Sequence, residues 1–252
     1  MYSSKVKYEK TLKKDPTMTY VLGSRCSDGV VIVGDTKFTI TNGPTEYMYD
    51  IGKVTGEQPG IISAFAGTRA KFERFRSEIR EFVSNYSGRI KDGISVDRVL
   101  IEISNIIERT SNKFDGFELL VGISGVYFAD KKSILKHFYT SGGYVPINGY
   151  KAIGSEAYGK VLLRNWRPEM TMKQIAELGY FVIRYIQELN LDEGVGIDEG
   201  HPVQVTFIPD KPTDKLDYPA DKQMLDDFEE RTKARLNKID AEPFFSSLTH
   251  SQ

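Results

Sequence analysis

The sequence is poor in the residues that build metal sites and disulfides. Cys26 is the only cysteine among 252 residues, which excludes an intramolecular disulfide and leaves too few thiolates for a cysteine-based zinc site. The three histidines, His137, His201 and His250, lie far apart and begin no HExxH or His/Cys zinc pattern. We therefore expect no metal site, and the near absence of cysteine fits a protein of the reducing cytoplasm.

Long apolar runs and net charge are also missing. The longest apolar runs, 29–33 and 60–66, have the length of strands and are too short to span a membrane. Thirty-four basic residues nearly balance 35 acidic ones, so no net field favours nucleic acid or an anionic membrane surface. The first residues include lysines but no apolar segment of a secretory signal. We expect a soluble protein whose partner is a small molecule or a polypeptide.

Several common catalytic motifs are absent as well. No Walker loop occurs, and the glycines at 142, 143, 149 and 154 form no dinucleotide fingerprint after a strand. Ser124 lies in the sequence GISG, which lacks the spacing of a nucleophile elbow. Arg25 precedes Cys26, but neighbours in a strand face opposite ways, so activation of the thiolate does not follow. We expect no bound cofactor, and we interpret Cys26 as a structural residue.

The sequence does contain strand and helix patterns in separate blocks. Strands are predicted at 20–25 and 30–36, with Asp28-Gly29 as the turn between them, and then around 53–55 and 60–66. Apolar residues next recur at three and four, which predicts one helix over 72–86 and another over 96–107.

The second half repeats this order. Strand patterns return at 117–124, 126–129, 134–139 and 149–153, and we expect the second sheet there. A short helix follows Ser155 to about Asn165, and Thr171 with Gln174 forms the capping-box pattern of a longer helix. A strand at 203–208 and a helix from about 220 to 239 complete the series. Segregated blocks of strands and helices predict α+β layers rather than a doubly wound parallel sheet.

The two ends differ in composition from the rest. Residues 1–18 carry five lysines against Glu9 and Asp15, a net charge of five minus two, or +3. Pro16 disfavours a helix at the residue before it and marks a boundary. We interpret 1–18 as a polar basic leader or propeptide, 19–210 as the folded domain, and 211–252 as a helical extension.

Four segments together resemble the proteasome subunit family. Residues 19–23 (TYVLG) and, after four residues, 28–39 (DGVVIVGDTKFT) are similar to the start of such a subunit. Residues 53–55 (KVT) and 61–67 (IISAFAG) resemble the family's lysine strand and Ala-Gly turn, and 150–155 (YKAIGS) resembles the segment that carries its conserved serine. Each piece is short, but they occur in the family's order from about Thr17 to Asp210.

The resemblance implies a fold and an assembly. The fold is a four-layer αββα sandwich of two antiparallel sheets between helix layers, the N-terminal-nucleophile hydrolase type, in agreement with the block order. The assembly is a ring of proteasome-family subunits, with one or several chain types, that degrades unfolded polypeptides and can be supplied by an ATP-dependent unfoldase.

The resemblance also implies a catalytic site without metal or cofactor. Thr19 matches the nucleophile, which becomes the mature N-terminus so that its freed amine acts as the base. Lys53 would lower the cost of deprotonating the hydroxyl, Asp35 would hold the lysine charged, the Gly67 amide would stabilise the oxyanion, and Ser155 would position the amine or a water. Structural alternatives stay open: a strand threonine, a plain ion pair, a turn glycine and a helix cap.

Two features depart from the family's pattern. Met18 stands before Thr19, where active subunits usually have the glycine that permits self-cleavage. The later aspartate and serine of the family have no clean counterpart, since Asp192 as the first would put Val195 at the second, while Asp198 offers another register. The chain is therefore either a threonine peptidase that loses its leader or a structural or gating subunit that keeps it.

Overall fold

The computed structural model describes residues 19–36, 52–58, 60–67, 69–86, 95–110, 118–125, 132–155, 163–189, 191, 195–197, 202–211 and 217–241. The predicted leader, the predicted strand at 126–129 and most of the predicted helix after Ser155 lie outside these residues. So do Met18, Asp192 and Asp198.

The described strands form two five-stranded sheets, and all neighbouring strands are antiparallel. The first sheet has the order β10-β9-β2-β1-β8 and the second has the order β3-β4-β5-β6-β7. The first sheet consists of β1 Tyr20–Arg25, β2 Gly29–Gly34, β8 Tyr150–Gly154, β9 Gln204–Pro209 and β10 Tyr218–Pro219. The second consists of β3 Val54–Gln58, β4 Ile61–Ala66, β5 Glu118–Ile123, β6 Ile134–Phe138 and β7 Tyr144–Pro146.

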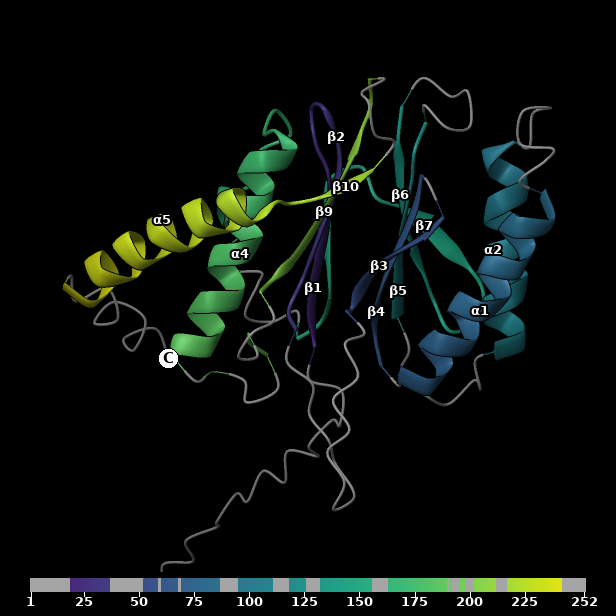
Figure 1. Cartoon of the computed structure of the whole chain (residues 1–252), viewed down its shortest axis with the longest axis horizontal. Helices are drawn as coiled ribbons and strands as arrows, with labels where there is room; N and C mark the ends of the chain where they lie inside the picture. Colours follow the sequence, from purple (N-terminus) through teal and green to yellow (C-terminus); the bar gives the residue numbers. More distant parts are fainter. Residues whose placement is uncertain are drawn as a thin grey trace, which may run out of the picture.

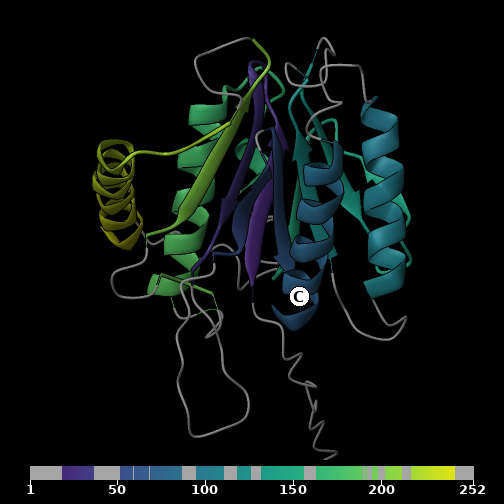
Figure 2. The ribbon, with the colours of Figure 1, turned by 45° about the vertical axis from the view of Figure 1, so that its right-hand side comes forward.

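Helices cover the outer faces of both sheets (Figure 1). α1 (Arg69–Tyr86) and α2 (Val96–Thr110) lie on the second sheet, and α4 (Met172–Glu188) lies on the first. α5 (Lys222–Ala241) packs on α4 at the outside of the molecule, as the turned view in Figure 2 also shows. A 3-10 turn, η2, spans Leu163–Asn165. The layers confirm the predicted αββα sandwich.

Three apolar clusters account for the four layers. One lies between α4 and the first sheet, where Leu22 and Val33 contact the helix side. A second lies between α1, α2 and the second sheet. The third lies between the sheets and includes Val21, Ile32 and Leu120. Because strands in the middle of this sandwich are buried on both faces, β1 and β2 are apolar along nearly their whole length.

Local signals explain where α4 begins. Thr171 and Gln174 form the predicted capping box, in which each side-chain oxygen accepts the backbone N–H of the other residue. Asp28, in the turn between β1 and β2, accepts the Met172 N–H at 2.8 Å with Oδ1. A carboxylate at a helix N-terminus also opposes the positive end of the helix dipole. The hairpin turn therefore sets the position of α4 on the first sheet.

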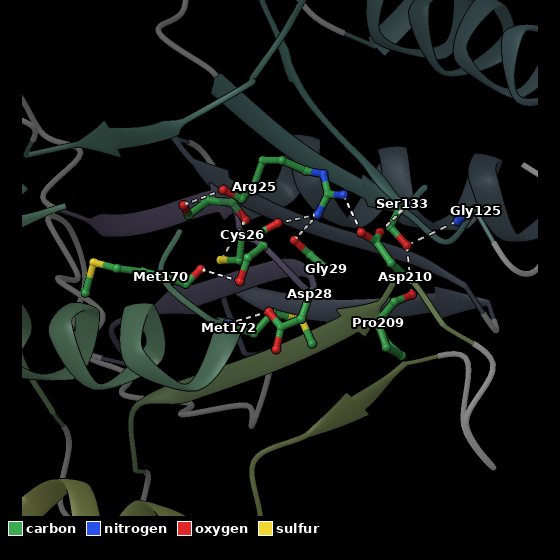
Figure 3. Close-up of polar contacts among 12 residues, drawn as sticks. Arg25, Cys26, Asp28, Gly29, Gly125, Ser133, Met170, Met172, Pro209 and Asp210 are labelled. Atoms are coloured by element: carbon green, nitrogen blue, oxygen red, sulfur yellow. Dashed lines mark hydrogen bonds and ion pairs between the residues drawn. The ribbon is translucent and has the colours of Figure 1, made fainter. Parts of the chain in front are cut away.

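A polar cluster around Arg25 and Asp210, drawn in Figure 3, lies at one end of the sandwich. The Arg25 guanidinium forms an ion pair with Asp210 and donates to the carbonyls of Cys26 and Gly29. The other Asp210 oxygen accepts the Ser133 N–H at 2.8 Å. Because Ser133 precedes β6 of the second sheet, the cluster joins the two sheets. It lies at the end of β1 farther from Thr19, and the six extended residues of β1 separate the two ends by about 20 Å.

The two sheets divide the strands differently from the order along the chain. We expected the second sheet within 117–153, and β5, β6 and β7 of that range lie in it, but β3 and β4 belong to it as well, and β8 pairs with β1 in the first sheet. A period of two shows which residues share a face and carries no information about the neighbouring strand. β7 and β10, with three and two residues, are too short to leave such a pattern.

In the described residues, no helix is long and apolar enough to cross a membrane.

Candidate functional site

The feature at the centre of the candidate site is a buried ion pair between Lys53 and Asp35. Lys53 Nζ lies 2.7 Å from Asp35 Oδ2, and the two side chains are 2% and 0% exposed. Asp35 directly follows β2 in the first sheet, whereas Lys53 directly precedes β3 in the second. The pair therefore joins the two sheets, and each charge depends on the other because neither is solvated.

Asp35 also holds the backbone next to Thr19. Its Oδ1 accepts the Tyr20 N–H at 2.9 Å, and its own N–H donates to the Tyr20 carbonyl at 3.0 Å. Burial raises the pKa of the Asp35 carboxyl to about 6, against the charge and hydrogen bond of Lys53 and the Tyr20 N–H, which act to lower it. One carboxylate thus fixes both the lysine and the start of β1.

Gly154 and Ser155 support Thr19 from the neighbouring strand. The Ser155 N–H donates to the Thr19 carbonyl at 2.7 Å. Gly154 has φ +79°, and a Cβ added there would lie 1.9 Å from the Thr19 carbonyl oxygen. Only glycine fits so close to another backbone in this left-handed conformation. The carbonyl of Thr19 is therefore held by the end of β8, and Thr19 itself is buried, with 6% of its surface exposed.

Gly67 follows β4, at the same end of the molecule as Thr19 and Gly154. It follows Ala66, whose Cβ lies 3.4 Å from the position of an added Gly154 Cβ. Gly67 has φ +130°, which side chains rarely adopt. The β4 strand is tied to the lysine as well, because the Phe65 N–H donates to the Lys53 carbonyl at 3.3 Å.

All five predicted site residues therefore lie at one end of the sandwich. Thr19 and Asp35 adjoin β1 and β2, Ser155 follows β8, and Lys53 and Gly67 come from the second sheet. Position 19 is two residues before Val21, which faces the second sheet, so it falls on the face directed at Lys53 and Gly67. The fold gathers these residues, while their roles in a reaction remain predictions.

A cysteine nucleophile and a metal site are the two other chemistries to compare with the described residues. Cys26 is buried at the opposite end of β1, and burial raises the pKa of its thiol to about 12, so it stays protonated near neutral pH. Among the described residues, no group of three or more His, Cys, Asp or Glu side chains could hold a metal ion.

The segment near the end of α4 is only partly described. Val195 is buried in the cluster between α4 and the first sheet. The neighbouring Gly196 carbonyl accepts the Thr36 N–H at 3.1 Å, which brings this segment beside the residue that follows Asp35. Both registers considered for the family's later aspartate stay open, because Asp192 and Asp198 lie outside the described residues.

Sequence reasoning missed two contributors to the site. The steric role of Gly154 is visible in the sequence only as a glycine before Ser155, and that residue type, which tolerates the left-handed φ found in the structure, is the signal that a turn analysis could have used. Glu118, at the start of β5, accepts the Gly154 N–H at 3.4 Å with Oε2. Nothing in its own sequence context distinguishes this glutamate from other acidic residues at strand ends.

The arrangement suits a reaction at the N-terminal side of Tyr20. A buried positive charge is held by Asp35, the same carboxylate accepts the backbone N–H next to Thr19, and Gly67 follows a strand at the same end of the sandwich. These are the elements that an activated hydroxyl nucleophile requires.

Comparisons with known proteins agree with this geometry. A family model described as Proteasome subunit matches residues 17–199. The solved structure of an Anbu (Gly-1) mutant from Hyphomicrobium sp. strain MC1 is 20% identical, with a TM-score of 0.65 over 89% of this chain and 97% of that one. Anbu (ancestral beta-subunit) from Yersinia bercovieri is 18% identical, with a TM-score of 0.66 and the same coverage. At such identities the two structures show a shared fold, and no match is found among curated proteins.

Proposed function

The chain belongs to the proteasome subunit family, and from this premise we propose that it is a threonine peptidase that cleaves unfolded polypeptides inside a ring-shaped compartment. Subunits of this family form oligomeric rings. The proposal makes Thr19 the N-terminal residue of the mature chain, after removal of the residues before it.

In the proposed reaction, Thr19 supplies both nucleophile and base. Its free amine, with an ordinary pKa of about 8, takes the hydroxyl proton while the oxygen attacks the substrate's carbonyl carbon. The tetrahedral intermediate collapses when the amine proton passes to the leaving nitrogen, the C–N bond breaks, and an ester to Thr19 forms. Water then attacks the ester, the amine again takes and returns a proton, and the hydroxyl is released with the second product.

The surrounding residues would stabilise the charges of these steps. Lys53, held by Asp35, would favour the developing negative charge on the threonine oxygen. The Gly67 N–H would donate to the oxyanion of the intermediate, an interaction worth about 3 kcal/mol where such donors have been removed. Ser155 would position the amine or a water, since its N–H already holds the Thr19 carbonyl.

One observation carries the proposal. Asp35 binds the Lys53 ammonium with one oxygen and the Tyr20 N–H with the other, so a buried positive charge is fixed relative to the residue next to Thr19. A purely structural ion pair needs no such link to the backbone beside Thr19. Buried pairs are also weak contributors to stability in general, which favours a functional reason for this one.

A second function is favoured by Met18. The residue before the cleaved bond is usually glycine in active subunits, and methionine there disfavours the sharply bent backbone that self-cleavage needs. A chain that keeps its leader has no free amine at Thr19, and it would serve as a structural or gating subunit of the ring.

The proposed setting of the protein is the cytoplasm, with other subunits of the family as ring partners. Substrates would be unfolded chains, because a closed compartment excludes folded domains, and an ATP-dependent unfoldase is the partner class that supplies such chains.

The function is tested with the purified assembled protein and an unstructured polypeptide, with products identified by mass spectrometry. We expect cleavage by the wild type and at least about a 1,000-fold loss of turnover in Thr19→Ala, with assembly unchanged. Thr110→Ala is the matched control, since Thr110 lies at the end of α2 and donates to the Ile106 carbonyl. Equal turnover by Thr19→Ala and the wild type would exclude Thr19 as the nucleophile.

A further inference from the structure

Glu118 reaches from the second sheet to the strand that supports Thr19. It begins β5, where it pairs with Ala66, the residue before Gly67. Its Oε2 accepts the N–H of Gly154, in the first sheet, at 3.4 Å. Its Oε1 lies 3.2 Å from His137 Nε2. The side chain therefore joins the two sheets beside the candidate site and apart from the Lys53–Asp35 pair.

The Gly154 N–H needs an acceptor from outside its own sheet. Among the strands that the structure describes, β8 lies at the edge of its sheet and pairs with β1. Successive N–H groups of a strand point to opposite sides, and the Ser155 N–H points to β1, where it donates to the Thr19 carbonyl. The Gly154 N–H consequently points to the open edge, and Glu118 accepts it there.

The environment of Glu118 keeps it ionised and in place. Burial acts to raise its pKa, but the contact with His137, the Gly154 N–H and the charge of Lys151 together lower it. His137 is 2% exposed and packs edge-on against Tyr139 at 4.6 Å between ring centroids. A charged acceptor forms a stronger hydrogen bond than a neutral one, and a packed histidine restricts where the carboxylate can lie.

The position of the β8 end affects Thr19 through two contacts. Gly154 lies against the Thr19 carbonyl so closely that no side chain fits, and the next N–H along β8 donates to the same carbonyl. A shift of the β8 end would move this carbonyl, and with it the amine and hydroxyl on the same residue. Small displacements of reacting groups cost large factors in rate.

We propose that Glu118 is a positioning residue for the peptidase reaction: it holds the Gly154 N–H so that the end of β8 stays seated on Thr19. Glu118 does not contact the reacting atoms in this account, and it acts through Gly154 and Ser155. The inference rests on the function proposed above for Thr19.

Three variants separate positioning from general stability. Glu118→Ala removes the acceptor, and we expect kcat to fall about tenfold, with KM within about twofold, because the loss of one charge-assisted hydrogen bond disturbs the reacting geometry rather than substrate binding. Glu118→Gln keeps an acceptor oxygen and should recover kcat to within about threefold of the wild type. Glu102→Ala is the control, since Glu102 pairs with Arg109 on the surface of α2, away from β8.

Hydrogen exchange gives a readout that does not depend on activity. A proteolytic peptide that covers 150–155 reports the Gly154 amide by mass, and we expect its exchange to be about fivefold faster in Glu118→Ala than in the wild type or Glu102→Ala. Glu118→Gln should exchange nearly as slowly as the wild type.

The outcomes are distinct. If the Gly154 amide exchange and the kcat of Glu118→Ala both equal those of the wild type, the proposal is overturned. Equal losses of kcat in the Ala and Gln variants, together with a lower unfolding temperature in both, also overturn it in favour of a structural role. If the wild type has no turnover at all, the proposed function fails, and faster exchange in Glu118→Ala then leaves Glu118 as a tie between sheets without a catalytic consequence.

Discussion

Lys53 Nζ lies 2.7 Å from Asp35 Oδ2, and almost nothing of either side chain is exposed to solvent. The two residues come from different sheets, so the pair ties the sheets together at the end where Thr19 lies. In the proposed reaction the same pair supplies the positive charge that stabilises the threonine oxygen. Stability and catalysis are therefore expected to depend on it in separable ways.

Replacing Lys53 alone should lower both properties. Lys53→Met leaves Asp35 buried without its counter-charge, so we expect it to lower the free energy of unfolding by about 3–5 kcal/mol. We also expect Lys53→Met to lower kcat by about 100-fold or more. Thermal unfolding and peptide turnover of the assembled protein measure the two effects.

The double variant separates the two roles. In Lys53→Met with Asp35→Asn no unpaired charge remains, and the introduced amide side chain would keep an oxygen for the Tyr20 N–H, so much of the lost stability should return. Turnover should stay as low as in Lys53→Met. Near wild-type turnover in either Lys53 variant would mean that the pair is only structural.

The pH dependence of turnover should report Asp35. Burial raises the pKa of its carboxyl from 3.8 to about 6, so below that pH it gains a proton and no longer balances Lys53. The Thr19 amine, with an ordinary pKa of about 8, must also be unprotonated. We expect log(kcat/KM) to rise with a slope near two below about pH 6 and near one between about 6 and 8.

The titration of Asp35 should change the free energy of unfolding in the opposite direction to turnover. The folded protein holds the Asp35 proton more tightly than the unfolded chain does, so this group contributes stability below its unfolded pKa of 3.8, and the contribution is lost as the pH rises through about 6. Asp35→Asn removes this titration, and its residual activity should follow a slope of one throughout. A slope of one in the wild type down to about pH 5 would contradict the assignment.

Gly154→Ala should damage the site through the backbone alone. The added Cβ would lie 1.9 Å from the Thr19 carbonyl oxygen, at a φ of +79° that alanine rarely adopts. We expect a loss of more than about 1 kcal/mol in the free energy of unfolding and a clear fall in kcat, because the end of β8 must move away from Thr19.

Gly56→Ala is the matched control for that change. Gly56 lies in β3 of the second sheet, and a Cβ added there meets no atom within 4 Å. Its unfolding temperature and turnover should stay near those of the wild type. Equal effects of the two substitutions would show that contact with Thr19 is not what makes position 154 sensitive.

Much of the fold was predictable from local patterns. The three-and-four spacing of apolar residues predicted α1 and α2, and Thr171 with Gln174 marked the start of α4. The family resemblance supplied the layer order and the candidates Thr19, Asp35, Lys53, Gly67 and Ser155. The structure places these five at one end of the sandwich, as the family's fold implies.

Long-range pairing was not predictable in the same way. Alternation assigns a residue to a face, but β8 could have joined either sheet, and only the tertiary packing puts it beside β1. The contact from Glu118 to the Gly154 N–H joins residues 36 positions apart in two different sheets. Likewise, the hydrogen bond from the Tyr20 N–H to Asp35 depends on how β2 ends, which no local pattern records.

The most direct test of the account is the N-terminal residue of the assembled protein, determined by intact mass together with sequencing of the N-terminal peptide. If the chain is a threonine peptidase, every active subunit begins at Thr19, because only then do its amine and hydroxyl belong to the same terminal residue. A working particle whose subunits all retain Met18 and the residues before it would contradict the peptidase and leave a structural member of the ring.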